Sequence, residues 1–433
     1  MTRRLGKYLS EPGRKRRILA LDGGGVRGFL TIEVLQQLEF ELRRRSGDDK
    51  YTLSQYFDLI GGTSTGSIIA TGLALGWSVS RVWAAYELIV PEIFGKASGA
   101  GFLSPRFENK PLAKAFLENF EKRDLESPDL ETGLAIFAKR MDRGSAWMMV
   151  NNPGWRYYDN QSPADSYAPN HAYELRSIVQ ASAAAPHFFR GVKMKIEHTA
   201  GKKKALDGHF VDGGVAGLNN PALELLTMVR DPAYGFNWDL GADNLYMLSV
   251  GTGWIRSVDR AKSVLGRFVE GLFIKQTVNA LRGMINDVSL QQVAYMQGLA
   301  RTDLRWFINA EKRYQDNRPY LSIPASAEPN APLMPLLHYQ RVDVRLEEEK
   351  DHAGQVLPES PSKLINRTLS GREVDGLNEI TNSKPENLEL LKELGQAAGK
   401  RFIRDAAPPG IFNPDPWIRS GDAAPTRLLR GDH

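Results

Sequence analysis

The chain has 433 residues and a mass of 48.3 kDa, which allows one large domain or two of ordinary size. Its composition, 42% hydrophobic and 25% charged, is that of a globular protein and excludes collagen-like fibre and wholesale disorder. There is no cysteine, which excludes disulfide scaffolds, thiol catalysis and cysteine-bound metal. No metal site and no cofactor is predicted, because no histidine pair has the helical spacing of a ligand set.

The positive charge gathers at the N-terminus. Residues 1–17 hold seven lysines and arginines against one acid, an excess larger than the +5 of the whole chain. Such an arm can attract anionic lipid, but we interpret it as a solvated, partly disordered tail. Because the sequence shows neither a secretory signal nor an apolar run of the ~20 residues that span a bilayer, we expect a cytoplasmic protein.

The first part of the chain repeats one plan. An apolar run over 17–21 predicts a buried strand, the glycine-rich segment 22–28 predicts a turn, and apolar residues on one face predict a helix over 30–45. The same order of strand, glycine-rich turn and helix recurs over 56–60, 61–66 and 67–75. This order implies a parallel sheet with crossover helices.

Further elements follow with less regularity toward the C-terminus. Strands are expected at 134–139, 147–150, 210–211, 245–250 and 341–346. Helices are expected at 79–90, 111–120, 172–181, 221–229, 264–285 and 387–402.

A G-x-S-x-G pattern, Gly62-Thr63-Ser64-Thr65-Gly66, stands where the second predicted strand turns into a helix. This is the setting of a nucleophile elbow, in which a strained turn exposes a serine hydroxyl. Gly62 and Gly66 are expected because a Cβ would clash in so sharp a turn. The helix N-terminus behind Ser64 favours negative charge that develops there.

The run Gly23-Gly24-Gly25 after the first strand exposes backbone N–H groups, which bind a phosphate or stabilise an oxyanion. With Gly28, the run also satisfies the dinucleotide-binding pattern G-x-G-x-x-G. That pattern requires an acid at the end of the next strand, and the sequence has Gly61-Gly62 there. The missing acid counts against nucleotide binding. A nucleotide-binding protein is kept as the alternative from another functional class.

A third motif, Asp212-Gly213-Gly214, follows a predicted strand and presents a carboxylate on a tight turn. Its distance from Ser64 in space cannot be read from the sequence. Histidine partners for a serine nucleophile are weighed as well. After Asp212 the candidates are His338, His352 and His433, and none lies in a recognisable loop after a strand. His187, which is flanked by aromatic residues, and the lone His209 are interpreted as structural.

Together the three motifs resemble the patatin-like phospholipase family, of bacterial type, from Ile18 to about Gly253. The resemblance implies an α/β fold, a three-layer sandwich with a mostly parallel central sheet flanked by helices. It implies lipid acyl hydrolysis by a Ser64–Asp212 dyad without histidine. The implied oxyanion hole is formed by Gly23, Gly24, Gly25 and Thr65, and the residues that support the motifs are Arg27, Gly28, Gly62, Gly66, Gly213 and Gly214. Arg27 is expected to anchor its loop.

On this basis the chain divides into a basic arm (1–16), a patatin-like catalytic domain (17–310), a C-terminal extension packed on the same domain (311–405) and a tail (406–433). The expected substrate is a phospholipid or another acyl ester, cleaved by a phospholipase A or lysophospholipase. Transient contact with a membrane surface is expected. An apolar helix face over 264–273 with nearby cations fits such a contact, but an apolar face of this kind is more often packed on the core, and that interpretation is favoured for it. No nucleic-acid polymer is expected as a partner.

A regulated phospholipase effector is the second function considered. Some bacterial relatives of the family are phospholipase effectors of anti-phage systems that cyclic nucleotides activate. A nucleotide activator is therefore kept as an alternative for this chain, although no sensor motif is visible after residue 310.

Overall fold

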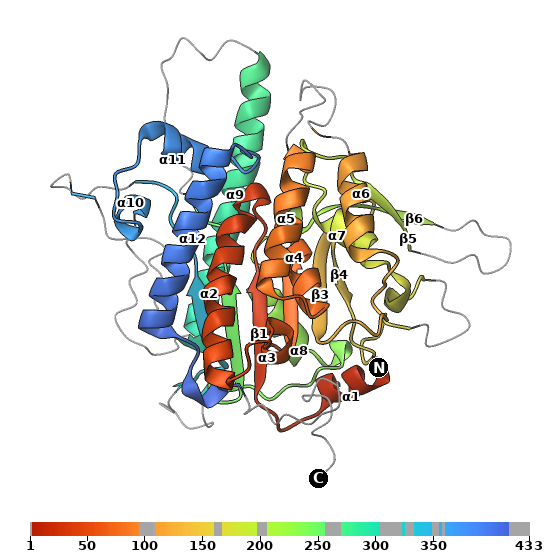
Figure 1. The fold of residues 1–433 in the computed structure, drawn as a ribbon. Helices are drawn as coiled ribbons and strands as arrows, with labels where there is room; N and C mark the ends of the chain where they lie inside the picture. Colours follow the sequence, from red (N-terminus) through yellow and green to blue (C-terminus); the bar gives the residue numbers. More distant parts are fainter. Residues whose placement is uncertain are drawn as a thin grey trace.

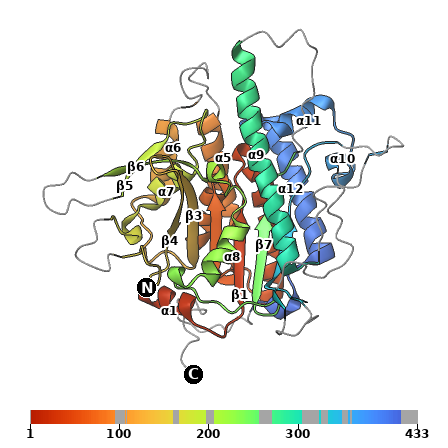
Figure 2. The same ribbon diagram turned by 180° about the vertical axis from the view of Figure 1, so that it is seen from behind.

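A central β-sheet with helices on both faces forms the body of the protein (Figures 1 and 2). The computed structural model describes residues 2–94, 107, 109–159, 167–196, 206–255, 270–303, 323–324, 333–348, 355–356 and 360–414. The predicted α/β sandwich with a mostly parallel central sheet is confirmed.

Nine described strands make the sheet, in the order β5-β6-β3-β2-β1-β7-β11-β8, with β4 also paired to β3. The strands are β1 (Arg16–Leu21), β2 (Leu59–Thr63), β3 (Gly133–Arg140), β4 (Ser145–Val150), β5 (Val192–Lys195), β6 (Asp207–Asp212), β7 (Leu245–Val250), β8 (Ala300–Arg301) and β11 (Leu337–Val342). From β3 to β8 along this order, neighbouring strands are parallel, whereas β4 and β6 run antiparallel to β3. A separate short pair joins β9 (Ile323–Pro324) to β10 (Leu333–Met334).

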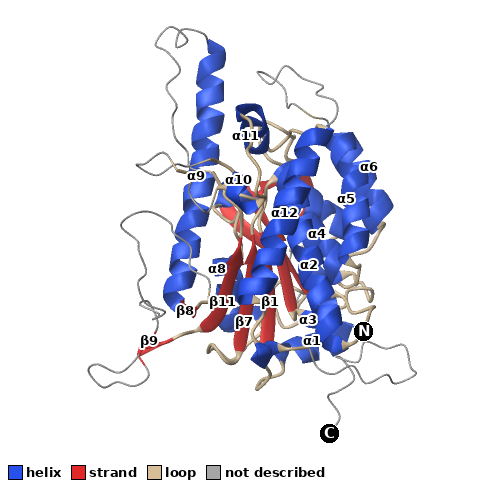
Figure 3. Cartoon of the chain, turned by 60° about the vertical axis from the view of Figure 1, so that its left-hand side comes forward, coloured by secondary structure: helices blue, strands red, loops and turns tan. Residues whose placement is uncertain are grey.

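The helices form two layers around the sheet (Figure 3). One face is covered by α2 (Gly28–Ser46), α4 (Thr65–Ala74), α5 (Val79–Phe94), α6 (Asn109–Phe120), α7 (Leu175–Ser182) and α12 (Pro385–Ala406). The other face is covered by α8 (Ala222–Arg230) and α9 (Glu270–Leu299). The shorter helices are α1 (Thr2–Ser10), α3 (Leu53–Tyr56), α10 (Pro361–Leu364) and α11 (Gly371–Asn378).

Alternation along the strands builds a core on each face of the sheet. In β1, Leu19 and Leu21 pack into the cluster beneath α2 and α4, whereas Ile18 and Ala20 pack into the cluster beneath α8. Because successive side chains of a strand point to opposite faces, a strand covered on both sides has to be apolar throughout. This explains why residues 18–21 form a continuous apolar run.

The second strand begins later than the sequence predicts, at Leu59. The preceding residues form α3, which starts where the backbone N–H of Thr52 donates a 2.9 Å hydrogen bond to the side chain of Gln55. Gly61 and Gly62, predicted as a turn, belong to β2. The strand needs glycine there, since a Cβ on Gly61 would lie 2.6 Å from the side chain of Leu225 on α8.

The N-terminal segment is not a solvated tail, and that interpretation is wrong for residues 2–16. Residues 2–10 form α1, whose Leu5 and Leu9 are buried in the core. The guanidinium of Arg16 lies 4.8 Å from the ring centre of Tyr8 and 5.1 Å from that of Trp238. Cation–π contacts of this kind attach the N-terminal segment to the fold. Arg16, one of the cations of the predicted basic arm, therefore makes contacts within the protein.

The C-terminal part completes both the sheet and one helical layer. Strand β11 pairs with β7 and β8, and α12 lies alongside α2 (Figure 1). Two glycines of α12 allow the close approach of the two helices. A Cβ on Gly395 would lie 2.5 Å from the carbonyl oxygen of Leu30, and one on Gly399 would lie 2.7 Å from the side chain of Gln37. Residues 415–433 of the predicted tail lie outside the described residues.

None of the described helices combines the length and the apolar character that crossing a bilayer requires. The side chains of residues 264–273, on which the expected membrane contact rests, lie outside the part of the structure that is described.

Replacing Gly395 by alanine should destabilise the protein by about 1–3 kcal/mol, because the new methyl group overlaps α2. Urea unfolding of the full chain measures this change. Gly371→Ala is the matched control, since nothing lies within 4 Å of a Cβ at that position. Equal stability of the two variants would contradict the close packing of α12 on α2.

Candidate active site

The register of β3 brings two distant segments together. Thr63, the last residue of β2, pairs with Phe137 of β3, and Asp212, the last residue of β6, pairs with Ala138. Strand β4 occupies the opposite edge of β3 over the same stretch. Because a strand has only two edges, β2 and β6 share one edge of β3 and meet end to end. Ser64 follows one of these strand ends directly beside Asp212.

Ser64 stands in a strained turn between β2 and α4. Its φ is 53° and its ψ is −123°, in a region that residues with a side chain rarely adopt. The turn is tight enough that a Cβ on Gly62 would lie 2.1 Å from the carbonyl oxygen of Gly66. Both predicted glycines are therefore sterically required, and Ser64 has the geometry of a nucleophile elbow.

The side chain of Asp212 lies beside the Ser64 hydroxyl. Asp212 is 6% exposed, and its carboxylate accepts a 2.8 Å hydrogen bond from the N–H of Gly214. Burial raises the pKa of Asp212 to about 6, while Ser64 and the N–H of Gly214 limit the rise. At neutral pH the group is ionised, and it is a stronger base than a free aspartate.

Backbone hydrogen bonds to other segments of the chain hold the glycine loop after β1. The N–H of Asp22 donates to the carbonyl of Val250, that of Gly23 to Asn219, and that of Val26 to Ile380, over 3.0 to 3.1 Å. The carbonyl of Gly25 accepts from the hydroxyls of Thr65 and Tyr86. A Cβ on Gly23 would lie 2.9 Å from the Cβ of Ser64, so the loop runs directly beside the serine.

The N–H groups that remain are those predicted for the oxyanion, with one correction. Among the described residues, the N–H groups of Gly24, Gly25 and Thr65 have no hydrogen-bond acceptor. Gly24 and Gly25 are half-buried rather than buried. Gly23 was included in the predicted oxyanion hole, but its N–H is already bonded to Asn219, so it supplies no donor.

Gly25 and Gly28 meet different requirements. Gly25 has a φ of +59°, and a Cβ there would lie 2.3 Å from the carbonyl oxygen of Ile380. Gly28 lets α2 approach α4, because its Cβ would lie 2.3 Å from the side chain of Thr65. Gly213 is pressed against the carbonyl of Phe137 on β3 in the same way.

Arg27 does not anchor the loop as expected. Within the described part of the chain, no hydrogen bond or ion pair of its guanidinium is found, and its Nε is buried without a partner. Burial lowers the pKa of Arg27 to about 10, with a smaller contribution from Arg282, while Asp343 and Asp22 oppose the shift. It therefore stays a cation at neutral pH beside the glycine loop.

Two residues that the sequence did not single out hold the Ser64–Asp212 pair. The hydroxyl of Ser182, at the end of α7, accepts the backbone N–H of Ser64 at 2.9 Å and donates to the carbonyl of Phe137 at 2.6 Å. The carbonyl of Ala184 accepts the N–H of Asp212 at 3.1 Å. One short segment thus holds the backbone of both residues.

No contact of His338 or His209 with Ser64 or Asp212 is found among the described residues. His338 lies near the start of β11, four residues before the strand end nearest the glycine loop. Its side chain hydrogen-bonds Asp303. His209 is exposed on β6. In the described residues, no group of three or more histidine and acidic side chains is placed to hold a metal ion.

Comparison with known proteins assigns part of the chain to a family. Residues 19–226 match the family model described as patatin-like phospholipase. Patatin-08 of Solanum tuberosum is 25% identical over 310 residues, which cover 68% of this chain and 76% of the relative. Patatin group D-2 of Solanum tuberosum is 26% identical over the same shares. Residues 19–226 thus form a patatin-like phospholipase domain, and they contain Ser64, Asp212 and the glycine loop.

Two solved structures share weaker similarity. VipD from Legionella pneumophila is 10% identical with a TM-score of 0.36, covering 90% of this chain and 67% of that one. Human GIVD cytosolic phospholipase A2 is 12% identical with a TM-score of 0.35, covering 93% and 61%. Similarity at this level carries no conclusion about this chain.

We expect a fluorophosphonate to phosphonylate Ser64 at a rate that follows the ionisation of Asp212. Because the base acts in its ionised form, the rate should rise about tenfold per pH unit below its pKa and level off above a midpoint of about 6. Stopped labelling reactions analysed by mass spectrometry give the rate. Ser64→Ala is the unlabelled control, and a rate independent of pH between acid and neutral conditions would contradict the role of Asp212.

Ser182→Ala should slow the same labelling reaction by roughly tenfold or more, since a small displacement of the nucleophile is costly. The variant should still fold, and it should unfold in a single cooperative transition like the wild type. Ser54→Ala is the matched control, because Ser54 is also buried and donates a 2.7 Å hydrogen bond, to Glu131 beside α3. Equal labelling rates in both variants would show that Ser182 does not position Ser64.

Proposed function

We propose that this protein is a lipid acyl hydrolase of the phospholipase A or lysophospholipase type. The observation that carries the proposal is the contact of the Ser64 hydroxyl with the buried carboxylate of Asp212, beside the unoccupied N–H groups of Gly24 and Gly25. The patatin-like phospholipase domain over 19–226 supports a lipid ester as the substrate.

The residues account for both halves of an ester hydrolysis. Ser64 Oγ attacks the carbonyl carbon while Asp212 takes the hydroxyl proton. The tetrahedral oxyanion accepts hydrogen bonds from Gly24 and Gly25, with the N–H of Thr65 at the start of α4 as a third donor. The ester bond breaks, the alcohol leaves with the proton from Asp212, and an acyl group remains on Ser64. Water, deprotonated by Asp212, then attacks this acyl group. The bond to Ser64 Oγ breaks, Asp212 returns the proton to that oxygen, and the fatty acid is released.

Asp212 serves as the base without a histidine because of where it sits. Burial raises its pKa to about 6, which reduces the difference in pKa between the carboxyl group and the serine hydroxyl. The bond from Gly214 holds one carboxylate oxygen, so the orientation toward Ser64 is maintained. The positive end of the α4 dipole lies at the same point and favours the developing negative charge.

The glycine loop suits an oxyanion better than a nucleotide phosphate. A phosphate-binding loop directs several successive N–H groups at its ligand. Here the N–H groups of Asp22, Gly23 and Val26 are used within the protein, and the two that remain lie beside Ser64. This observation favours the esterase over the nucleotide-binding alternative. Activation by a cyclic nucleotide and transient contact with a membrane surface stay predictions.

Hydrolysis of a soluble ester and of phospholipid vesicles tests the function. We expect wild-type activity that EDTA leaves unchanged, and losses of about 10³-fold or more in Ser64→Ala and Asp212→Asn. The control is Asp303→Asn, which removes a carboxylate bonded to His338 away from the site. Wild-type protein inactive on all esters, with and without cyclic nucleotides, would overturn the proposal. An active Asp212→Asn variant would overturn the dyad alone.

A further inference from the structure

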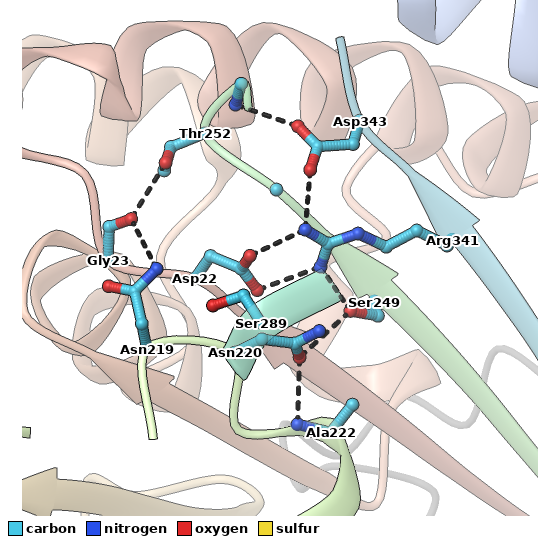
Figure 4. Close-up of polar contacts among 12 residues, drawn as sticks. Asp22, Gly23, Asn219, Asn220, Ala222, Ser249, Thr252, Ser289, Arg341 and Asp343 are labelled. Carbon is cyan, nitrogen blue, oxygen red and sulfur yellow. Dashed lines mark hydrogen bonds and ion pairs between the residues drawn. The ribbon is translucent and has the colours of Figure 1, made fainter. Parts of the chain in front are cut away.

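Arg341 reaches the glycine loop from a part of the chain beyond the family match. It lies on β11, where it pairs with Ser249 of β7, and the matched segment ends at residue 226. Its side chain is 4% exposed and reaches Asp22, the first residue of the loop (Figure 4).

The guanidinium makes four hydrogen bonds around one point. Two parallel bonds go to the carboxylate of Asp22, from Nη1 at 2.9 Å and from Nη2 at 2.6 Å. A third goes to Asp343 at 2.6 Å and a fourth to the hydroxyl of Ser249 at 2.6 Å. This forked pattern is specific to arginine, because a lysine ammonium is a point charge and cannot bond both carboxylate oxygens in the same plane.

Asp22 is therefore held by both its backbone and its side chain. Its N–H donates to Val250 on β7, while Arg341 holds its carboxylate. The next residue, Gly23, is held through its own peptide groups by Asn219 and by the hydroxyl of Thr252 at 2.8 Å. The two residues before the free N–H of Gly24 are thus clamped in place.

The same arginine also holds the segment that carries Thr252. Asp343 accepts a bond from Arg341 and another, of 2.8 Å, from the N–H of Gly253 (Figure 4). A Cβ on Gly251 would lie 2.1 Å from the carboxyl carbon of Asp343, so the contact is close. Arg341 therefore acts on the glycine loop by two routes, directly through Asp22 and indirectly through Asp343 and Thr252.

The charges of this buried cluster compensate one another. Asp22 and Asp343 are two acids, and Arg341 is one cation that contacts both. Arg27 is a second cation whose field acts on both acids. Burial raises the pKa of Asp22 to about 6, and Arg341 is the largest opposing influence. A buried ion pair adds little to stability compared with an apolar replacement, but removal of one partner leaves a buried charge without compensation.

We infer that Arg341 is a positioning residue that holds the glycine loop so that Gly24 and Gly25 point at the reacting ester. The inference rests on the proposed function, and it assigns to the C-terminal part of the chain a share in the active site. It requires that oxyanion stabilisation, rather than substrate binding, fails when Arg341 is replaced.

The test compares Arg341→Met and Arg341→Lys with wild type in the full-length protein. A fluorophosphonate counts the active sites, so kcat on a soluble ester is expressed per competent site. We expect kcat to fall on the order of 10²-fold in Arg341→Met, with KM nearly unchanged. Arg341→Lys keeps the charge and loses the fork, so it should also lose most of kcat.

A second readout separates positioning from general damage. A trifluoromethyl ketone forms a tetrahedral oxyanion on a serine, so its inhibition constant should rise in step with the fall in kcat/KM. The matched control is Arg345→Met, which removes an equally buried arginine that pairs with Glu347 at 3.0 Å. This variant should keep kcat and the inhibition constant of wild type.

Three results would overturn the inference. One is an Arg341→Lys or Arg341→Met protein with wild-type kcat. Another is a lower number of active sites with unchanged kcat per site, which indicates a structural role only. The third is a loss of kcat with an unchanged inhibition constant. Should Arg341→Met fail to fold, Arg341→Lys and Asp22→Asn carry the same comparison. Wild-type protein without esterase activity would overturn the proposed function instead.

Discussion

The site depends on one edge of a single strand. Strand β3 carries β4 along one side, so β2 and β6 have to share the other, and they meet at adjacent residues of β3, Phe137 and Ala138. Ser64 and Asp212 stand at this junction. Since the positions follow from backbone pairing within a buried sheet, they do not depend on flexible loops. The strained turn at Ser64 persists because the sheet, α4 and the hydroxyl of Ser182 hold it from three sides.

The glycine loop shows how a protein exposes donors in a buried place. Backbone N–H groups that are buried without a partner are costly, so nearly every one finds an acceptor. In this loop the N–H groups of Asp22, Gly23 and Val26 obey that rule, whereas those of the half-buried Gly24 and Gly25 have no acceptor among the described residues. Unused donors next to a serine hydroxyl and a buried carboxylate are what an oxyanion requires. The bonds of the residues on either side hold these donors in place.

Segments at both ends of the chain support this arrangement. The N-terminal helix is attached by the cation–π contacts of Arg16, and the C-terminal part contributes β11, α12 and the arginine that bonds Asp22. The carbonyl of Ile380, between α11 and α12, accepts the N–H of Val26. The described residues after 310 therefore take part in the same core and in the same hydrogen-bond network as the glycine loop.

The sequence by itself determined the local features of this protein. The apolar run of β1, the glycines around Ser64 and the Asp-Gly-Gly turn are written in neighbouring residues, because periodicity and turn chemistry are local. The tertiary structure alone decided the contacts between distant segments: the meeting of Ser64 with Asp212, the loss of the Gly23 N–H to Asn219, and the roles of Ser182 and Arg341. Such contacts depend on which strands share an edge and in what register. A linear pattern of residue types does not encode that choice, which emerges only when the whole sheet is packed.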